Sequence, residues 1–503
     1  MTLDYDLSSI QQARDLVRKA KEAQEIFCGY GEEKIEKILL AMVRAAEANA
    51  EHLARLAVNE TKFGVVADKV TKNKFASTYV YQFFKKMKTT GVIAEDKENG
   101  VLEVAVPVGV ILALTPTTNP TSTVIHNALC AVKAGNAIIF SPHPSARECS
   151  IAAVQLLQKA AETAGAPKNL ISGLSQLTMQ GTEALMKNDD VALIIATGGS
   201  AMVKAAYSAG KPAIGVGPGN VPAFIERSAD IKQAVADIIA SKTFDNGVIC
   251  ASEQAILADA PVEQAVIKEL KAQGCYFLNK EEIEKVSRLL MTPKGGMNAA
   301  WVGQSAAAIA KGAGINAPFN AKLLIAPLEG HGPGYPLSYE KLTSALAFYK
   351  VSDWHEACQL SIELLKLGGI GHTFSIHSQN DQVIREFIQK PVFRILVNTP
   401  SALGGIGYTT GLAPSMTLGC GTWGGSSISE NMSPKHLINI KRLAYGKRPG
   451  QPSAVSSRSA GDAWDSSRRL TTDDRQPPAA CSVTSEDIAS IVKQVLQQMP
   501  IGR

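Results

Sequence analysis

Apolar residues recur at helical spacing through roughly the first ninety residues of the chain. The clearest run is 35–46, where neither glycine nor proline interrupts the pattern. An alternating segment, Val101–Pro107, follows and is typical of a β-strand. Because Pro107 lacks a backbone N–H, we expect an edge strand there.

From residue 108 the pattern changes to short apolar strands that alternate with helical stretches. We expect strands at 108–114, 137–140, 191–196 and 211–216, and helices at 122–134, 145–164 and 200–209. A second such region runs from about 222 to 415, with strands expected at 254–258, 347–349, 372–377 and 394–397. This alternation predicts right-handed βαβ units, mostly parallel sheets and hence an α/β protein.

The composition changes after Gly446. Residues 447–482 are rich in Ser, Arg, Pro, Gly and Asp, which predicts a flexible linker because little apolar surface is available for burial. Helical spacing returns at 483–500, with Thr484 as a candidate cap and Pro500 as the stop. A tethered amphipathic helix of this kind is typical of a docking element.

Composition narrows the class of protein. A length of 503 residues predicts about three folding units. The net charge of +5 comes without a long basic run, so we expect no nucleic-acid partner. No apolar run reaches the ~18 residues that span a bilayer, and the N-terminus lacks a signal-peptide pattern. We therefore expect a cytoplasmic protein that has no membrane partner.

The cysteines and histidines do not form a metal-binding pattern. The eight cysteines are at least 19 residues apart, which excludes a Cys-x-x-Cys motif. The eight histidines include no His-Glu-x-x-His spacing. We therefore expect no metal site.

Two segments carry candidate chemistry. Cys250 follows a glycine-containing turn, where a deprotonated thiol could attack a carbonyl carbon. The alternative for Cys250 is a buried small apolar residue. Asn119 follows an expected parallel strand, where its amide could donate to a developing oxyanion. The alternative for Asn119 is an Asx-type turn before a helix.

Two glycine-rich turns are candidate nucleotide contacts. Gly198 and Gly199 lie between an expected strand and helix, an arrangement that suits a phosphate, although the GxGxxG fingerprint is absent. The segment Gly215-Val-Gly-Pro-Gly219 could let a ligand approach the backbone, or could simply cross between domains.

The order and spacing of these segments resemble the aldehyde dehydrogenase superfamily, in particular its CoA-acylating branch, over roughly residues 5–445. The most specific blocks are PTTNP at 116–120, FSPHP at 140–144, FDNGVICASEQ at 244–254, LGCGTWGG at 418–425 and PKHLIN at 434–439. They are similar to bacterial acetaldehyde and propionaldehyde dehydrogenases of the microcompartment type, and to the aldehyde dehydrogenase half of bifunctional aldehyde-alcohol dehydrogenases.

The resemblance implies a role for each matching residue. Cys250 would be the nucleophile, and the Asn119 side chain would form the oxyanion hole together with the Cys250 N–H. His372 would lie in the active site or near CoA, or else be a structural histidine, and Glu340 would hold the nicotinamide ribose, or else be a solvated surface carboxylate. The implied cofactor-binding residues are Thr115, Pro116, His143, Thr197, Gly198, Gly199, Val203, Gly217 and Glu340.

Two departures from hydrolytic aldehyde dehydrogenases are informative. The stretch 215–219 has no carboxylate where those enzymes carry the glutamate that activates water. Without that base water should attack slowly, because positioned proton transfer contributes roughly 10²–10⁴-fold, whereas CoA brings its own thiolate. His143 replaces a lysine that contacts the adenosine ribose, so we expect NAD and leave NADP open.

The resemblance thus implies a Rossmann-like dinucleotide-binding domain at 1–220 with an oligomerisation hairpin near 92–107, a catalytic domain at 221–415 and a return segment at 416–446. The implied reaction oxidises a short aldehyde with NAD and CoA to acyl-CoA through a cysteinyl thioester. Acetaldehyde is the first expected substrate and propionaldehyde the second. We expect a homodimer or homotetramer.

The tail resembles the encapsulation peptides that target enzymes to bacterial microcompartments, which implies shell or core proteins as partners. The alternative is that the helix docks on its own tetramer. Two rival functions are a hydrolytic aldehyde dehydrogenase with Glu253 as its base, and a non-catalytic scaffold that recruits a shell.

Overall fold

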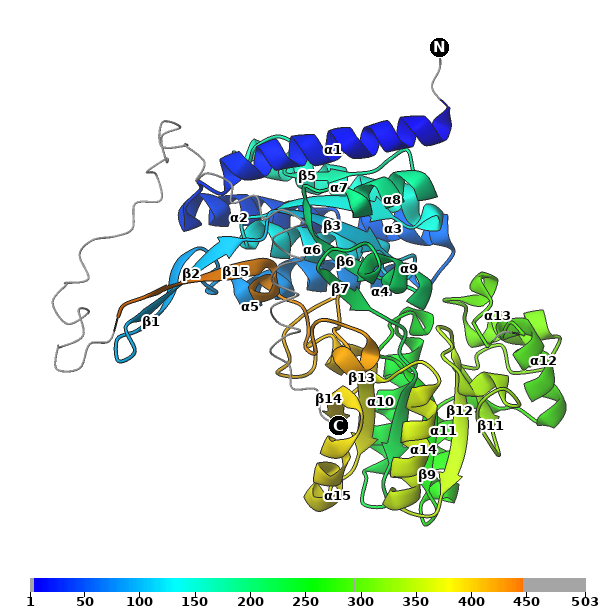
Figure 1. The fold of residues 1–503 in the computed structure, drawn as a ribbon. Helices are drawn as coiled ribbons and strands as arrows, with labels where there is room; N and C mark the ends of the chain where they lie inside the picture. Colours follow the sequence, from blue (N-terminus) through cyan, green and yellow to red (C-terminus); the bar gives the residue numbers. More distant parts are fainter. Residues whose placement is uncertain (1–3, 294, 447–503) are drawn as a thin grey trace, which may run out of the picture. The chain divides into compact units, whose positions relative to one another are not determined.

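A computed structural model of the chain describes residues 4–293 and 295–446. The expected tail helix and its linker lie outside these residues. The N-terminal region is helical, as the apolar spacing predicts, and the run 35–46 lies within one helix. The helices are α1 (Tyr5–Phe27), α2 (Glu32–Ala48), α3 (Ala50–Thr61), α4 (Val66–Lys74) and α5 (Val80–Phe84), with a π-helical turn at Phe75–Tyr79 between the last two (Figure 1).

A five-stranded parallel sheet follows, in the order β5-β4-β3-β6-β7. Its strands are β3 (Val110–Thr115), β4 (Ala137–Pro142), β5 (Ile171–Gly173), β6 (Val191–Thr197) and β7 (Ala213–Val216). The connecting helices are α6 (Pro120–Lys133), α7 (Arg147–Thr163), α8 (Met179–Lys187) and α9 (Ser200–Tyr207). Strands β3 and β4 are wholly buried, which explains why they are continuous apolar runs. The four expected strands are confirmed; β5, with three residues, was too short to predict.

A second parallel sheet has seven strands in the order β10-β11-β12-β9-β8-β13-β14. Its strands are β8 (Val221–Ile225), β9 (Glu253–Asp259), β10 (Cys275–Phe277), β11 (Leu323–Pro327), β12 (Ala345–Val351), β13 (Gly371–His377) and β14 (Val392–Val397). The helices of this region are α10 (Ile231–Thr243), α11 (Glu263–Ala272), α12 (Lys280–Leu290), α13 (Ala306–Ala313), α14 (Trp354–Lys366), α15 (Asp381–Glu386) and α16 (Ser401–Gly405). Apolar clusters cover both faces of the sheet. The expected strands are β9, β12, β13 and β14.

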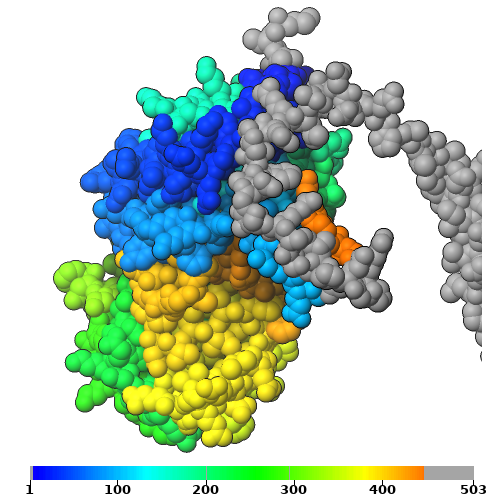
Figure 2. Space-filling model, turned by 90° about the vertical axis from the view of Figure 1, so that its left-hand side faces the viewer, coloured from blue at the N-terminus to red at the C-terminus, as the bar shows by residue number. Residues whose placement is uncertain are grey.

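A three-stranded antiparallel sheet corrects one expectation. It joins β1 (Gly91–Asp96), β2 (Val101–Pro107) and β15 (Ile438–Ala444) in the order β1-β2-β15, so β2 is its central strand and not an edge strand. Pro107 is tolerated because it is the last residue of β2, opposite Ile438 at the start of β15. Strands β1 and β2, coloured blue to cyan, run beside the orange β15 in Figure 1. The same colours also lie close to each other in the space-filling view of Figure 2.

The two parallel sheets supply residues to one place. Asn119, just beyond the C-terminal end of β3, hydrogen-bonds to Val248 in the segment before β9. The loop between β7 and β8 carries Gly219, whose N–H donates to Glu340 before β12. The C-terminal edge of the first sheet and the N-terminal edge of the second therefore frame a common site. None of the described helices is long and apolar enough to cross a membrane.

Candidate active site

Cys250 lies in a turn between α10 and β9. The chain enters it through Asp245 and Asn246, both with φ of 51°, and Gly247 with φ of 75°. Three successive left-handed residues reverse the chain, and at Gly247 a Cβ would lie 2.9 Å from Thr343 O, so a glycine is required there. Cys250 is partly buried and packs against the apolar core.

The Asn119 side chain points towards this turn. Asn119 precedes α6, but its side chain makes no capping hydrogen bond, so the Asx-turn alternative is wrong. Its Nδ2 instead donates to Val248 O and to Thr118 Oγ1, both at 3.2 Å. Its Oδ1 accepts a 2.7 Å hydrogen bond from Lys72 Nζ. The amide nitrogen is thereby held against the carbonyl of Val248, which lies two residues before Cys250 in the sequence.

Gly219 packs directly against Cys250. A Cβ at this position would lie 2.2 Å from Cys250 O and 3.1 Å from His372 Nδ1. The Gly219 N–H donates to Glu340 Oε1 over 2.8 Å. Burial raises the pKa of Glu340 to about 7, and the Gly219 N–H opposes that rise. Glu340 is partly buried and bonded to the backbone, which excludes the solvated-carboxylate alternative.

Burial keeps the Cys250 thiol protonated at neutral pH. Burial raises its pKa to about 12, and the charges of Glu340 and Cys420 act in the same direction. The Arg394 guanidinium, and the N–H of Cys250 itself, lower the pKa. Attack on a carbonyl carbon therefore requires a proton to leave first.

His372 and Arg394 form a buried pair bridged by Thr373. His372 Nδ1 lies 2.9 Å from Thr373 Oγ1, which also accepts a 3.2 Å hydrogen bond from Arg394 Nε. Burial and the Arg394 charge hold the pKa of His372 well below its usual range, so the imidazole is neutral at pH 7. His372 Nε2 is buried and has no hydrogen-bond partner among the described residues, whereas Nδ1 is bonded to Thr373.

The expected cofactor residues fall into two groups. Thr115 and Thr197 end β3 and β6, and the Oγ1 atom of each is buried without a partner among the described residues. A Cβ at Gly198, Gly199 or Gly217 would meet no described atom within 4 Å, so space is open beside the strand ends.

The remaining expected cofactor residues are enclosed or occupied. Pro116 follows β3 and is buried. Val203 is also buried, with its Cγ1 2.6 Å from where a Cβ of Gly215 would lie. The Nδ1 atom of exposed His143 accepts a hydrogen bond from Ser145 N. The open glycines and the two unpaired threonine hydroxyls fit a dinucleotide that passes over the ends of the first sheet.

Glu253, the base of the hydrolytic alternative, hydrogen-bonds to the first residue of α16. Its Oε1 accepts a 2.9 Å hydrogen bond from Ser401 N, and burial raises its pKa to about 7. The ammonium group of Lys242 interacts electrostatically with both Glu253 and Glu340. Glu253 Oε2 is buried and has no hydrogen-bond partner among the described residues.

Sequence reasoning missed three residues of the site. Lys72 and Asp245 belong to a buried ion pair that reaches Asn119, and Arg394 acts on Cys250 from β14. Lysines three apart at 69 and 72 within a helix are an ordinary surface pattern. Only the packing of α4 on the Cys250 turn reveals their use.

Comparison with known proteins decides the family. The family model described as "Aldehyde dehydrogenase family" matches residues 3–275. The chain belongs to this family. It is 46% identical over 444 residues to the bifunctional aldehyde-alcohol dehydrogenase of Escherichia coli. This alignment covers 87% of the chain but only 50% of that protein. The chain thus spans about half the length of this relative.

Two solved structures of aldehyde dehydrogenases resemble the chain over most of its length. An acetylating aldehyde dehydrogenase from Geobacillus thermoglucosidasius is 51% identical with a TM-score of 0.88, covering 89% of this chain and 99% of its own. A propionaldehyde dehydrogenase from the fucose utilisation microcompartment of Clostridium phytofermentans is 30% identical with a TM-score of 0.79, covering 86% and 97%. The expected fold and family resemblance are confirmed.

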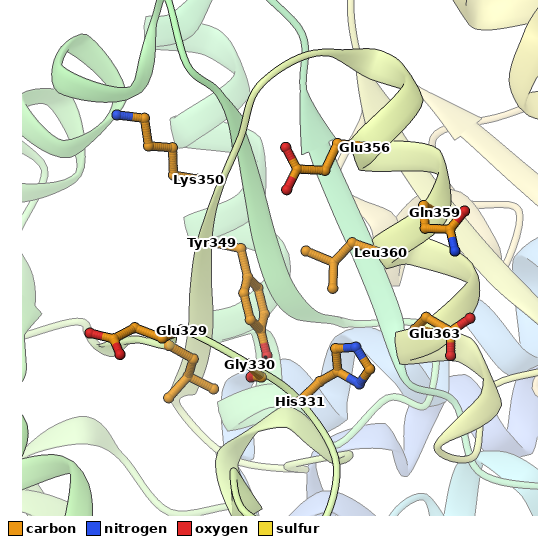
Figure 3. A pocket seen from close by; sticks show the side chains of 10 residues that line it. Glu329, Gly330, His331, Tyr349, Lys350, Glu356, Gln359, Leu360 and Glu363 are labelled. Atoms are coloured by element: carbon orange, nitrogen blue, oxygen red, sulfur yellow. Dashed lines mark hydrogen bonds between the residues drawn. The ribbon is translucent and has the colours of Figure 1, made fainter.

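This member of the aldehyde dehydrogenase family also has a surface hollow outside the site. It lies between the end of β12 and α14, and Figure 3 shows Glu329, His331, Tyr349, Glu356 and Glu363 around it. None of the residues lining it belongs to the Cys250 site described above. Within 4–293 and 295–446, no group of three or more His, Cys, Asp or Glu side chains could hold a metal ion.

Proposed function

We propose that the chain is a CoA-acylating aldehyde dehydrogenase that oxidises a short aldehyde and passes the acyl group to CoA. One observation carries this proposal: Asn119 Nδ2 is held beside the Cys250 turn, 3.2 Å from Val248 O, while the backbone packed against Cys250 is the carboxylate-free loop ending at Gly219. A nucleophile and an oxyanion donor are thus combined, and the loop packed against them supplies no carboxylate to act as a base for water.

In the first half-reaction, which oxidises the aldehyde, each residue of the site has a separate role. The Cys250 thiol releases its proton to solvent and the thiolate attacks the aldehyde carbon, and the Asn119 amide with the Cys250 N–H would stabilise the oxygen charge of the thiohemiacetal. Arg394 favours the thiolate, because it lowers the pKa of Cys250. The residues that fit NAD are Thr115, Thr197 and the open glycines beside them. NAD, when bound, supplies the hydride acceptor that leaves an acyl thioester on Cys250.

In the second half-reaction a nucleophile removes the acyl group from Cys250, and CoA is better suited to this step than water. Water needs a positioned base, and the loop 215–219 offers only backbone, whereas CoA carries a thiol that ionises more readily. His372 Nε2 is neutral, buried and unpaired among the described residues, so it can accept the CoA proton when Nδ1–H donates to Thr373. The acyl group then passes from the Cys250 thioester to the sulfur of CoA, and Cys250 is released.

The finer assignments extend the same proposal. We take acetaldehyde as the first substrate and propionaldehyde as the second, with NAD preferred and NADP left open by His143. We also propose the division into domains at 1–220, 221–415 and 416–446, and pairing of the β1–β2 hairpin with a second subunit in a dimer or tetramer. The exposed Ile440 and Leu443 on the adjoining β15 support such a contact.

A microcompartment is the proposed location. The composition of 447–482 and the amphipathic spacing of 483–500 support a tethered docking helix for shell or core proteins. The structural relative from a fucose utilisation microcompartment shows that such an enzyme occurs in that setting. Deleting 447–503 should leave activity intact and abolish association with shell proteins; loss of activity would favour docking on the enzyme's own oligomer.

Replacing Cys250 with Ala tests the proposed chemistry. Turnover should fall below about 1% because the covalent step is lost, while NAD binding measured by calorimetry should persist. In the native enzyme, mass spectrometry after reaction with acetaldehyde and NAD without CoA should show an acetyl group on Cys250. Acetylation elsewhere, or full activity of Cys250→Ala, would contradict the assignment.

A further inference from the structure

A buried charge cluster lies behind the proposed oxyanion donor. The side chains of Lys69, Lys72 and Asp245 are 3%, 1% and 0% exposed. Asp245 Oδ2 accepts hydrogen bonds from both ammonium groups, and the Asp245 N–H donates to Asp68 Oδ2 over 2.8 Å. Taking these charges out of water is costly even though they are paired, so ion pairing alone gives little stability as a reason for the cluster.

Lys72 extends this cluster to Asn119. Its Nζ donates to Asn119 Oδ1 over 2.7 Å. An ammonium group only donates, so the atom that it meets must be the amide oxygen, and the two orientations of the Asn119 amide are no longer equivalent. The nitrogen must then face Val248 O and the Cys250 turn, at 3.2 Å. Both contacts of Nδ2 are long, so a substrate oxygen can replace one of them.

We propose that Lys72 is a positioning residue that orients and polarises the Asn119 amide as an oxyanion donor. The proposal rests on the role of Asn119 in the proposed function. A charge-assisted hydrogen bond at Oδ1 draws electron density from the amide and makes its N–H a stronger donor. The effect grows as charge develops on the substrate oxygen, so it stabilises the transition state more than the bound aldehyde.

Lys69 provides a matched control. It shares Asp245 Oδ2 with Lys72, at 2.9 Å, and its second bond of 3.0 Å goes to the Thr118 carbonyl. It therefore contributes to the same buried cluster without touching the Asn119 side chain in the contacts described. When either lysine is replaced, Asp245 keeps the other ammonium group and the Val65 N–H, which donates to Oδ1 over 2.7 Å. Each single variant should therefore fold.

The experiment is a double-mutant cycle on the full chain. Lys72→Met, Asn119→Ala, the double variant and Lys69→Met are compared by kcat/KM for acetaldehyde at saturating NAD and CoA, with Tm and NAD affinity measured alongside. Lys72→Met should lower kcat/KM about 10- to 100-fold, mostly through kcat, because one oxyanion donor contributes about 10²–10³-fold. Lys69→Met should lower it less than about 3-fold at a similar loss of Tm. In the Asn119→Ala background, Lys72→Met should cost less than about 3-fold.

Each other outcome separates the two proposals. An equal loss from Lys72→Met with and without Asn119, or an equal loss from Lys69→Met, would mean that Lys72 is only structural. If Asn119→Ala itself leaves kcat unchanged, the oxyanion role fails, and the positioning role with it. Should Lys72→Met not fold, Lys72→Gln keeps a donor without the charge, and its kcat should lie between those of the native enzyme and Asn119→Ala. A kcat equal to the native value would overturn the proposal.

Discussion

The backbone N–H of Gly219 donates a 2.8 Å hydrogen bond to Glu340 Oε1, and this bond holds the β7–β8 loop against Cys250. The loop contains no carboxylate of its own, but it is hydrogen-bonded to the carboxylate of Glu340, which lies in the segment before β12. Glu340 thus acts on the Cys250 thiol through its charge, and raises the thiol pKa.

Removing that charge should activate the thiol. Glu340→Gln keeps an acceptor for the Gly219 N–H but loses the negative charge that raises the pKa of Cys250. We expect iodoacetamide to alkylate Cys250 about 3- to 10-fold faster at pH 8, because a lower thiol pKa increases the thiolate fraction. Glu253→Gln is the control, because that carboxyl bonds to Ser401 and should leave the rate unchanged. Slower alkylation of Glu340→Gln would show that Glu340 instead removes the thiol proton.

The high thiol pKa has a pH signature. With a pKa of about 12 in the free enzyme, the thiolate fraction of Cys250 at pH 8 is about 10⁻⁴ and rises tenfold with each pH unit. Alkylation of Cys250, followed by mass spectrometry of its peptide, should therefore increase about tenfold per unit from pH 7 to 9. A plateau below pH 8 would mean that the free enzyme already stabilises the thiolate.

The packing of Gly219 leaves no room for a methyl group. A Cβ there would lie 2.2 Å from Cys250 O, so Gly219→Ala must displace the backbone of the nucleophile. We expect kcat to fall at least about 100-fold, because misplacement by about 1 Å can cost that much. Gly334→Ala is the control, since its Cβ would meet no described atom within 4 Å. Comparable activity in the two variants would show that the Cys250 turn adapts freely.

His372 should affect the two half-reactions differently. Its loss removes the proposed proton acceptor for CoA but leaves Cys250 and Asn119 in place. In stopped-flow experiments His372→Ala should keep the first burst of NADH while steady-state turnover with CoA falls about 100-fold. His331→Ala, an exposed histidine, serves as the control. A burst that disappears together with turnover would place His372 in aldehyde oxidation.

The parallel core could be predicted because its strands are continuous apolar runs separated by helices. The same logic located Asn119, since a residue after a parallel strand lies at the ligand-binding edge. Pattern reasoning failed where partners are distant in sequence. It placed β2 at an edge because β15, its second partner, lies more than 330 residues further along. It also gave no reason to connect Lys72 with Asn119 or Arg394 with Cys250, because those contacts depend on how α4 and β14 pack.

Dependence on CoA tests the proposed function most directly. NADH formation should be followed by absorbance with acetaldehyde and NAD, in the presence and absence of CoA, and the product identified in each case. Because the loop beside Cys250 supplies no base for water, we expect sustained turnover only with CoA, and acetyl-CoA as the product. Equal rates without CoA, with acetate as the product, would contradict acyl transfer and establish a hydrolytic enzyme.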